Sequence, residues 1–499
     1  MKHNWILRTA AVFLPLCLGA QDLKEFEKRV TEFTLANGLH FIVLQRPEAP
    51  VVSVLTRVDV GGANDPAGKT GIAHMFEHMA FKGTDSLGTT NWLAEKKALA
   101  DIEAIYDKID AETNKGPRGS KDTIEKLQKE LKATIDKANS YVDKEAYSRV
   151  ISLNGGVGMN AGTGAESTTY FYSLPSNRLE LWFLLTSQVF KNPIMREFYK
   201  ERDVVREERR MRVESSAQGK MVQLLLQTTF LAHPQRNIIG WASDIENLRA
   251  KEALDFYRKY YVPSNMVMVI AGDVDPKEAK RLADQYFSSL PAGTQPPRVI
   301  TEEPKQEGER RATIDTESQP MLFMAYKRPN GFHPDDAPLA VLASALASGR
   351  TGVIYKEMVE QKKLALFAAA ASNFIGEKYP GAFLMYSMPA VGKTIEENEK
   401  ALEEIIERVK KEKIEDHVIR RVKTQIRAGL IRGLDSNMGM AMQLAENYQL
   451  HGDWRRMFTQ IDDLEKVTAD DLMRVAKTYL VDSGRTVVYS NNPKKGDSK

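Results

Sequence analysis

The sequence predicts an α+β protein built from two similar domains, and two observations lead to this fold class. The chain has 499 residues, which is too long for a single hydrophobic core. In addition, a pattern of helix, tyrosine, short break and apolar strand occurs twice, in "DIENLRAKEALDFYRKYYVPSNMVMVIAG" and in "QIDDLEKVTADDLMRVAKTYLVDSGRTVVYS". Leu248 of the first copy corresponds to Leu464, and Tyr261 corresponds to Tyr479. We interpret the two copies as a diverged duplication, with a chance likeness of two helix–strand units as the alternative.

Turn residues and apolar runs define the elements of the first half. The segment "TEFTLANGLHFIVL" predicts a hairpin around Asn37-Gly38, where a positive φ is easily adopted. The runs "VVSVLTRVDV" and "NMVMVIAGDV" predict buried strands, while "NRLELWFLLTSQVF", "EFYKERDVVREERRMRVES" and "ALDFYRKYY" predict helices. The polar stretch "GTQPPRVITEEPKQEGERR" is the expected join, so we place the two domains at residues 21–297 and 298–499.

One segment has no counterpart in the second half. Residues 95–150 are rich in Lys, Glu and Asp, and their apolar residues recur at helical spacing on two stretches separated by "NKGPRGS". This pattern predicts an inserted helical hairpin whose charged faces are solvated.

The first 20 residues predict a signal peptide. Lys2, His3 and Arg8 precede the apolar run "AAVFLPLCLGA", which is short for a membrane span and ends in small residues. We expect cleavage near Ala20 and a periplasmic or secreted mature chain with no membrane span; a short membrane anchor is the alternative. Cys17 is the only cysteine, so the mature chain would contain no disulfide.

The overall charge is close to balance. With 70 basic and 67 acidic residues the formal net charge is +3, which gives no reason to expect a nucleic acid or an acidic membrane surface as partner.

The segment "GIAHMFEHMAFKGT" contains two histidines four residues apart with a glutamate between them. On a helix, His74 and His78 lie on one face and could direct their imidazoles at one ion, with Glu77 close enough to reach a water on it. A pair of neutral imidazoles suits zinc, and a neighbouring carboxylate could act as general base. Two ordinary surface histidines are the alternative.

A third ligand is expected, and the segment "KERDVVREERRMRVE" offers candidates. Glu201 and Glu208 are two helical turns apart and share a face, whereas Glu207 points about 100° away from Glu208. The alternative is a solvent-facing helix stabilised by Glu–Arg pairs.

These segments resemble the pitrilysin/insulinase family of zinc peptidases, in particular its bacterial subgroup related to mitochondrial processing peptidase. His-x-x-Glu-His is the inverzincin signature. The blocks "GKTGIAHMFEHMAFKGT", "GMNAGTGAESTTYFYSLP", "ERDVVREERRMR" and "YYVPSNMVMVIAGDVD" are similar to the family's core segments. The resemblance implies two α/β-roll domains, each a mainly antiparallel sheet with helices on one face.

The resemblance also implies the roles of the site residues. His74, His78 and Glu208 would bind one Zn²⁺ per chain, Glu77 would be the general base, and Glu201 would orient a ligand histidine. Such a chain would be a zinc endopeptidase acting on peptides or unfolded segments. The substrate would bind extended beside "NAGTGAES", and Asn160 and Ala161 are the expected contacts. A processing peptidase for one precursor and a non-catalytic structural or assembly subunit are the alternatives.

Two features depart from the family pattern. The interval of 130 residues from His78 to Glu208 is longer than usual, which the insertion explains. Family members that work as complete enzymes carry an Arg and a Tyr in a second-half stretch shaped like "LYxRLRxxxGLAY", whereas this chain has "IYKEMVEQKKLALF", with Val359 and Leu366 at those positions. We therefore expect a sister subunit that supplies the Arg and Tyr, with a self-sufficient homodimer as the alternative.

Overall fold

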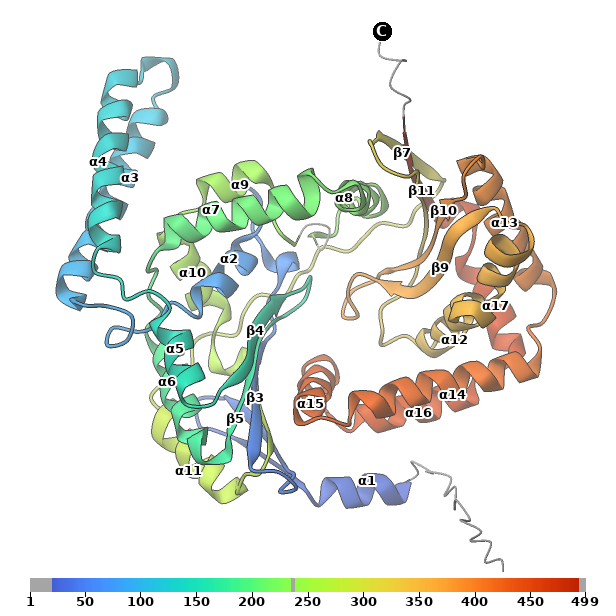
Figure 1. Cartoon of the computed structure of the whole chain (residues 1–499), viewed down its shortest axis with the longest axis horizontal. Helices are drawn as coiled ribbons and strands as arrows, with labels where there is room; N and C mark the ends of the chain where they lie inside the picture. The colour runs from blue at the N-terminus through green and yellow to red at the C-terminus, as the bar shows by residue number, and fades with distance from the viewer. Residues whose placement is uncertain (1–19, 235–237, 493–499) are drawn as a thin grey trace, which may run out of the picture.

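Two mixed sheets with their helices make up the protein, as a computed structural model that describes residues 20–234 and 238–492 shows (Figure 1). The predicted signal peptide lies outside these residues except for its last position. In the order β1-β2-β6-β3-β5-β4, the strands of the first sheet are Val30–Thr34, His40–Gln45, Met266–Gly272, Val51–Val58, Thr168–Pro175 and Val157–Thr163. In the order β7-β11-β8-β10-β9, those of the second are Arg310–Asp315, Arg485–Asn491, Leu322–Lys327, Ala382–Pro389 and Ala365–Phe374.

The two sheets match strand for strand. The order β2-β6-β3-β5-β4 corresponds to β7-β11-β8-β10-β9, and in each sheet only the first of these pairs, β2 with β6 and β7 with β11, is parallel. The repeated sequence pattern forms the same unit in both halves. It runs through α9 (Ala242–Asn247), α10 (Ala250–Tyr260) and β6, and again through α16 (Arg456–Lys466), α17 (Ala469–Tyr479) and β11. The predicted fold class, two similar and mainly antiparallel α+β domains, is confirmed.

Most helices cover the outer faces of the sheets. On the first half these are α2 (Ile72–Met79), α6 (Leu179–Lys191), α7 (Phe198–Arg209) and α11 (Pro276–Phe287), together with α9 and α10. On the second they are α12 (Asp336–Ala347), α13 (Ile395–Lys411) and α14 (Asp416–Gly433), together with α16 and α17. No helix within residues 20–234 and 238–492 carries an apolar stretch long enough to cross a bilayer.

Alternating side chains explain why the central strands are apolar throughout. In β2, Phe41 and Val43 belong to the core beneath the outer helices, whereas Ile42 and Leu44 belong to a second core on the other face. Because successive side chains of a strand point to opposite faces, a strand that is buried on both sides needs an unbroken apolar run.

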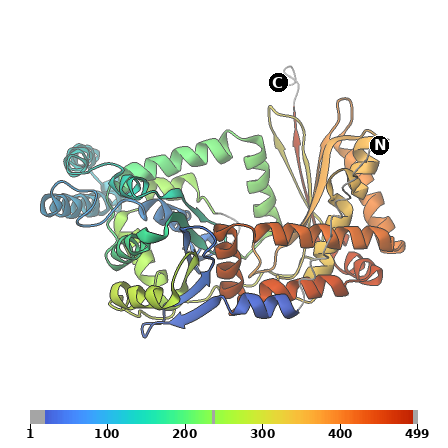
Figure 2. The same cartoon turned by 60° about the horizontal axis from the view of Figure 1, so that its bottom comes forward.

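The second face of each sheet is covered by a helix from the other half, which the sequence analysis did not predict. Met440 and Leu444 of α15 (Asn437–His451) pack against the first sheet. Met221 and Leu225 of α8 (Ala217–Thr229) pack against the second. Both helices lie between the two sheets (Figures 1 and 2). The join at residues 291–309 contains no helix or strand. The boundary at 297/298 stays a prediction, because each half exchanges a helix with the other.

The inserted hairpin forms as predicted. Helices α3 (Trp92–Thr113) and α4 (Lys121–Asn139) pack against each other and project from the body of the molecule (Figure 1). The side chain of Asn91 caps the start of α3, and that of Ser120 caps the start of α4. A short helix, α5 (Ala146–Leu153), leads from this arm into β4.

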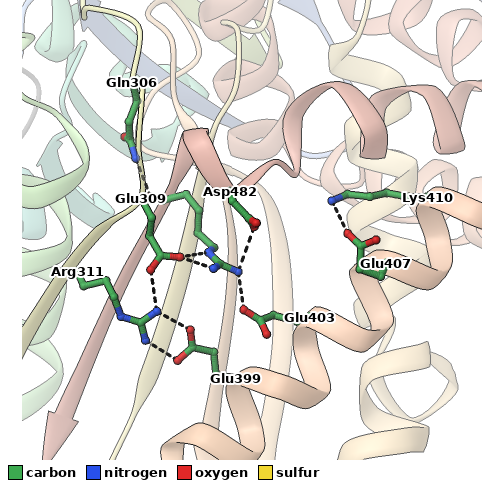
Figure 3. Close-up of polar contacts among 9 residues, drawn as sticks. Gln306, Glu309, Arg311, Glu399, Glu403, Glu407, Lys410 and Asp482 are labelled. Carbon is green, nitrogen blue, oxygen red and sulfur yellow. Dashed lines mark hydrogen bonds and ion pairs between the residues drawn. The ribbon is translucent and has the colours of Figure 1, made fainter.

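Charged side chains fasten α13 to the β7–β11 side of the second sheet (Figure 3). Arg311 of β7 forms a two-pronged ion pair with Glu399, at 2.8 and 2.6 Å. Arg485 of β11 contacts Glu403 at 2.6 Å, and Glu309 accepts from both arginines. This network holds the helix layer of the second half in place over its sheet.

A turn of the first half is held by a loop of the second. The carboxylate of Glu166, between β4 and β5, accepts three consecutive backbone N–H groups, those of Glu377, Lys378 and Tyr379, at 2.9 to 3.1 Å. The Lys378 ammonium contacts both oxygens of Asp59, at 2.8 and 2.7 Å. The second half therefore fixes the end of β4 where that strand approaches α2.

Candidate metal centre

Helix α2 presents its polar residues on one side. Gly71, with φ at +90°, begins the helix, and the Asp65 carboxylate accepts the N–H groups of Gly71 at 2.6 Å and Ala73 at 3.1 Å. A Cβ on Gly71 would lie 2.6 Å from a backbone oxygen, which explains the glycine. The apolar residues of α2 are buried in the first core, including Met75 and Phe76. The helix is thereby fixed with its histidines turned away from the apolar side.

The structure brings His74, His78 and Glu208 together. The Nε2 atom of His78 lies 3.4 Å from Oε2 of Glu208, and Nε2 of His74 lies 3.7 Å from the same oxygen. One donor atom from each residue can be chosen so that all three lie within 4.8 Å of one another. A tetrahedral zinc ion with ligand bonds of about 2.0 to 2.1 Å requires separations of about 3.3 Å between its donors. The cluster is close to that spacing.

The charges of the cluster also suit a divalent cation. Burial and the neighbouring His78 lower the pKa of His74 to about 4, so His74 is neutral at pH 7. Burial alone would lower the pKa of His78, but hydrogen bonds to Glu201 and Glu208 outweigh it and raise that pKa to about 9. The carboxylates of Glu201 and Glu208 therefore favour a positive charge at His78. Two imidazoles and one carboxylate form a donor set that zinc accepts with a further position open.

Glu201 lies behind His78 rather than in the cluster. Its Oε2 is 3.4 Å from His78 Nδ1, and its other oxygen contacts the ammonium of Lys82. Lys82 also lies 3.4 Å from Glu197. A carboxylate on Nδ1 fixes the tautomer and turns the Nε2 lone pair towards the cluster. Lys82 was not predicted from the sequence, although its position four residues after His78 was a possible signal.

Glu77 lies beside the cluster and is held by a strand. Thr163 at the end of β4 donates its hydroxyl to Glu77 Oε2 at 2.6 Å. Burial raises the pKa of the Glu77 carboxyl, as expected for a group that gives or takes a proton. Thr163 was not predicted to belong to the site, because nothing in a sequence reveals which strand position faces a helix.

A cavity of about 650 Å³ opens next to His74 and Thr163. Its walls include Val222 and Leu226 of α8 and the side chain of Arg212. Arg212 forms an ion pair of 3.0 Å with Glu208 Oε1, the carboxylate oxygen that does not face the histidines. The cavity is large enough for several atoms of an extended chain beside the three donors.

Asn160 and Ala161, the expected substrate contacts, lie on β4 at the edge of the first sheet. The Ala161 N–H donates to the side-chain oxygen of Asn160 at 2.9 Å. A peptide that adds to this edge at Ala161 has to displace that side chain. The substrate role of both residues stays a prediction.

Two family models match most of the chain. The model described as "Insulinase (Peptidase family M16)" matches residues 41–102 and 132–240, and "Peptidase M16 inactive domain" matches residues 247–426. The chain belongs to the insulinase family. The first of these matches contains His74, Glu77, His78 and Glu208.

Relatives and solved structures agree with this membership. The chain is 26% identical to "Zinc protease PqqE" of Helicobacter pylori, with 98% of this chain and 99% of that protein covered. It is 24% identical to a "Probable mitochondrial-processing peptidase subunit beta" of Schizosaccharomyces pombe, covering 90% and 88%. "The crystal structure of a protease from Helicobacter pylori" superposes with a TM-score of 0.76 at 25% identity, over 93% of this chain and 99% of that one. "The crystal structure of the periplasmic protease PqqL from Escherichia coli" shares the fold, with a TM-score of 0.69 at 15% identity, over 94% of this chain and 48% of that one.

The positions expected to carry an Arg and a Tyr are apolar in this insulinase-family chain, and neither lies on the first half. Val359 packs against the core of the second half, and Leu366 on the edge strand β9 is 53% exposed. Neither side chain can donate a hydrogen bond.

Proposed function

We propose that this chain is a zinc-dependent endopeptidase that hydrolyses peptides or unfolded polypeptide segments. The observation that carries the proposal is the meeting of His74, His78 and Glu208 within 4.8 Å, beside the carboxylate of Glu77 and a cavity of about 650 Å³. The name of the Helicobacter pylori relative, a zinc protease, supports the same reaction.

The chain's own residues have distinct tasks in this proposal. Zinc held by His74, His78 and Glu208 would supply Lewis acidity and lower the pKa of water towards neutrality. Glu77 accepts a proton from the attacking water and delivers it to the leaving nitrogen of the substrate. Thr163 keeps the Glu77 carboxylate in position through its 2.6 Å hydrogen bond.

The residues around the donors restrict their movement. Glu201, itself held by Lys82, fixes the orientation of the His78 ring. Arg212 engages the second oxygen of Glu208. Three donors with fixed positions need little rearrangement when an ion binds, and a site that is prepared in this way binds more tightly.

The substrate would lie extended along the edge strand β4, close to Asn160 and Ala161. Main-chain hydrogen bonds to a sheet edge give affinity with little dependence on sequence. This binding mode favours peptides and unfolded segments, because an edge of a folded protein is already paired or covered.

We further propose that the chain is the zinc-bearing subunit of a heterodimer. The apolar Val359 and Leu366 support this, since the Arg and Tyr that hold substrate in complete enzymes of the family are missing. The relative named as a processing-peptidase subunit beta also supports it. A homodimer is the alternative.

We place the mature chain in the periplasm or outside the cell, on the evidence of the basic and apolar character of its first 20 residues. Cleavage near Ala20 is checked by sequencing the amino terminus of the protein purified from its host. An uncleaved terminus in the membrane fraction would contradict this localisation.

The proposed activity is tested by purifying the chain from its native host, identifying the proteins that accompany it and measuring zinc per chain. The preparation is then incubated with a mixed peptide library, with and without a chelator. We expect one zinc per chain and many cleavage sites that disappear with the chelator and return with added zinc. Cleavage at very few sites would instead indicate a processing peptidase. Absence of both zinc and cleavage, with the accompanying proteins present, would refute the proposal.

A further inference from the structure

The metal-ligand helix α7 has two opposite faces in use. Glu201 and Glu208 are seven residues apart and point towards α2, whereas Tyr199 and Arg202 point towards the inserted arm. Contacts on the second face therefore help to hold the helix that carries the carboxylates on the first. The base of the arm makes most of these contacts, and Arg202 also donates to the backbone oxygen of Leu248 at 3.2 Å.

The first turns of α7 are held by two residues of α3. The Tyr199 hydroxyl donates to Glu103, and the Tyr199 ring stacks on the ring of Tyr106, with 4.6 Å between centroids and 23° between planes. Arg202 lies over both rings, 5.0 Å from the Tyr199 centroid and 5.9 Å from that of Tyr106, and donates to the Tyr106 hydroxyl at 3.3 Å. Together these contacts restrict both rotation and sliding of the helix.

The start of α7 is fixed by a buried ion pair with the same arm. Arg196, two residues before the helix, contacts Glu95 of α3 at 2.7 and 3.1 Å, and both side chains are 1% exposed. The guanidinium of Arg196 also donates to the backbone oxygens of Lys82, Thr84 and Leu87, at 2.6 to 3.0 Å. These oxygens belong to the segment that follows α2. One side chain thus connects the arm, the histidine helix and the glutamate helix.

The base of the arm is in turn anchored to the body of the first half. Arg249, at the start of α10, contacts Glu103 at 3.0 Å, Asp107 at 2.8 Å and Asp110 at 2.7 Å, all on one side of α3. These three ion pairs hold α3 against α10, while α7 rests on both helices. Helix α3 is therefore fixed to α7 on one side and to the start of α10 on the other.

We propose that the base of the arm is a positioning element of the metal centre, and that Glu103 and Tyr106 keep Glu208 and Glu201 in place for binding zinc. This inference rests on the proposed zinc site. The insulinase model matches residues 41–102 and 132–240, so both positioning residues lie in a segment that the family model leaves out. The insertion would then contribute to metal affinity as well as extend the surface.

The test compares zinc affinity among variants of the full chain, by competition with a chelating dye at a temperature well below unfolding. We expect Glu103→Ala and Tyr106→Ala together to weaken zinc binding about tenfold or more, the range typical for residues that orient metal ligands. Tyr106→Phe retains the stacked ring and should stay within about twofold of the unmodified protein. Glu125→Ala, an exposed position on α4, is the matched control and should leave the affinity unchanged.

Glu103 and Tyr106 could instead merely stabilise the fold. The visible spectrum of the Co²⁺-substituted protein separates the two roles, because it reports the arrangement of ligands around the metal. We expect the double variant to give an altered cobalt spectrum while its metal-free form stays folded. If the double variant does not fold, Glu103→Ala alone serves, because Arg249 retains Asp107 and Asp110. Unchanged zinc affinity and cobalt spectrum in a folded variant would overturn the inference. Failure of the unmodified protein to bind zinc would refute the proposed function itself.

Discussion

Replacing Glu77 by Gln should abolish hydrolysis while leaving the metal in place. Glu77 is not among the three residues whose donor atoms lie within 4.8 Å of one another, so zinc content should stay at one per chain. The amide has the shape of the carboxylate, and its oxygen can still accept the hydrogen bond from the Thr163 hydroxyl, which lies 2.6 Å away in the unmodified protein. The side chain should therefore keep its orientation. What the variant loses is the ability to take a proton from water and to return it to the leaving nitrogen.

The size of the effect follows from that loss. A positioned general base accelerates its reaction by about 10²- to 10⁴-fold, which corresponds to about 3 to 5 kcal/mol of the activation barrier. Because Glu77 would serve both the attack and the departure of the amine, we expect kcat to fall at least about 10³-fold.

The assay is steady-state cleavage of a quenched fluorescent peptide by the complete assembly, together with zinc analysis of each preparation. Thr163→Val is the matched control, because it keeps the carboxylate and removes only its hydrogen bond, worth about 1.4 kcal/mol or tenfold in rate. A Glu77→Gln protein that cleaves at the unmodified rate would refute the role of Glu77 as base. One that loses its zinc would show instead that Glu77 is a ligand.

Three further predictions concern other parts of the molecule. Glu208→Gln should lower zinc affinity at least about tenfold, whereas Glu207→Gln, on the exposed neighbour that pairs with Arg210, should not; metal titration of both variants checks this. Burial alone would raise the pKa of Glu303, but Lys327 and the backbone N–H groups after α8 lower it to about 2. Glu303→Gln should therefore cost about 3 kcal/mol at pH 7, and the difference from the unmodified protein should shrink as pH falls from about 4.5 towards 2; denaturant unfolding at several pH values measures this, and a constant difference would contradict it. Asn160→Ala should lower the KM of peptides severalfold at unchanged kcat, because the side chain no longer competes for the edge N–H; a higher KM would show that Asn160 itself contacts the substrate.

The parts of the site that depend on one helix could be predicted from the sequence. His74 and His78 share a face because they are four residues apart, and Glu201 and Glu208 share a face because they are seven apart. Contacts between elements could not be predicted in this way. The hydrogen bond from Thr163 to Glu77 depends on how far β4 extends towards α2, and that register is set by its pairing with β5.

The same distinction holds for the fold. The repeated helix–strand pattern predicted two similar sheets, since each copy contains a complete local unit. The exchange of α8 and α15 left no such signal. An amphipathic helix such as α8 shows which of its sides is apolar, here the side of Met221 and Leu225, but not which sheet covers it.

The duplication gave two matching sheets, yet the described residues contain one cluster that could hold a metal ion. Helix α12 follows β8 as α2 follows β3, but its residues, including Leu339 and Leu342, are mostly buried in the second core. Its sequence, Asp336–Ala347, also contains no histidine, cysteine or glutamate that could serve as a ligand like those of α2. The second half instead supplies α15 for the other face of the first sheet and the Lys378 loop for the turn after β4. In the proposed reaction, the second half would therefore act through the position of Thr163, and through it of Glu77, rather than through donors of its own.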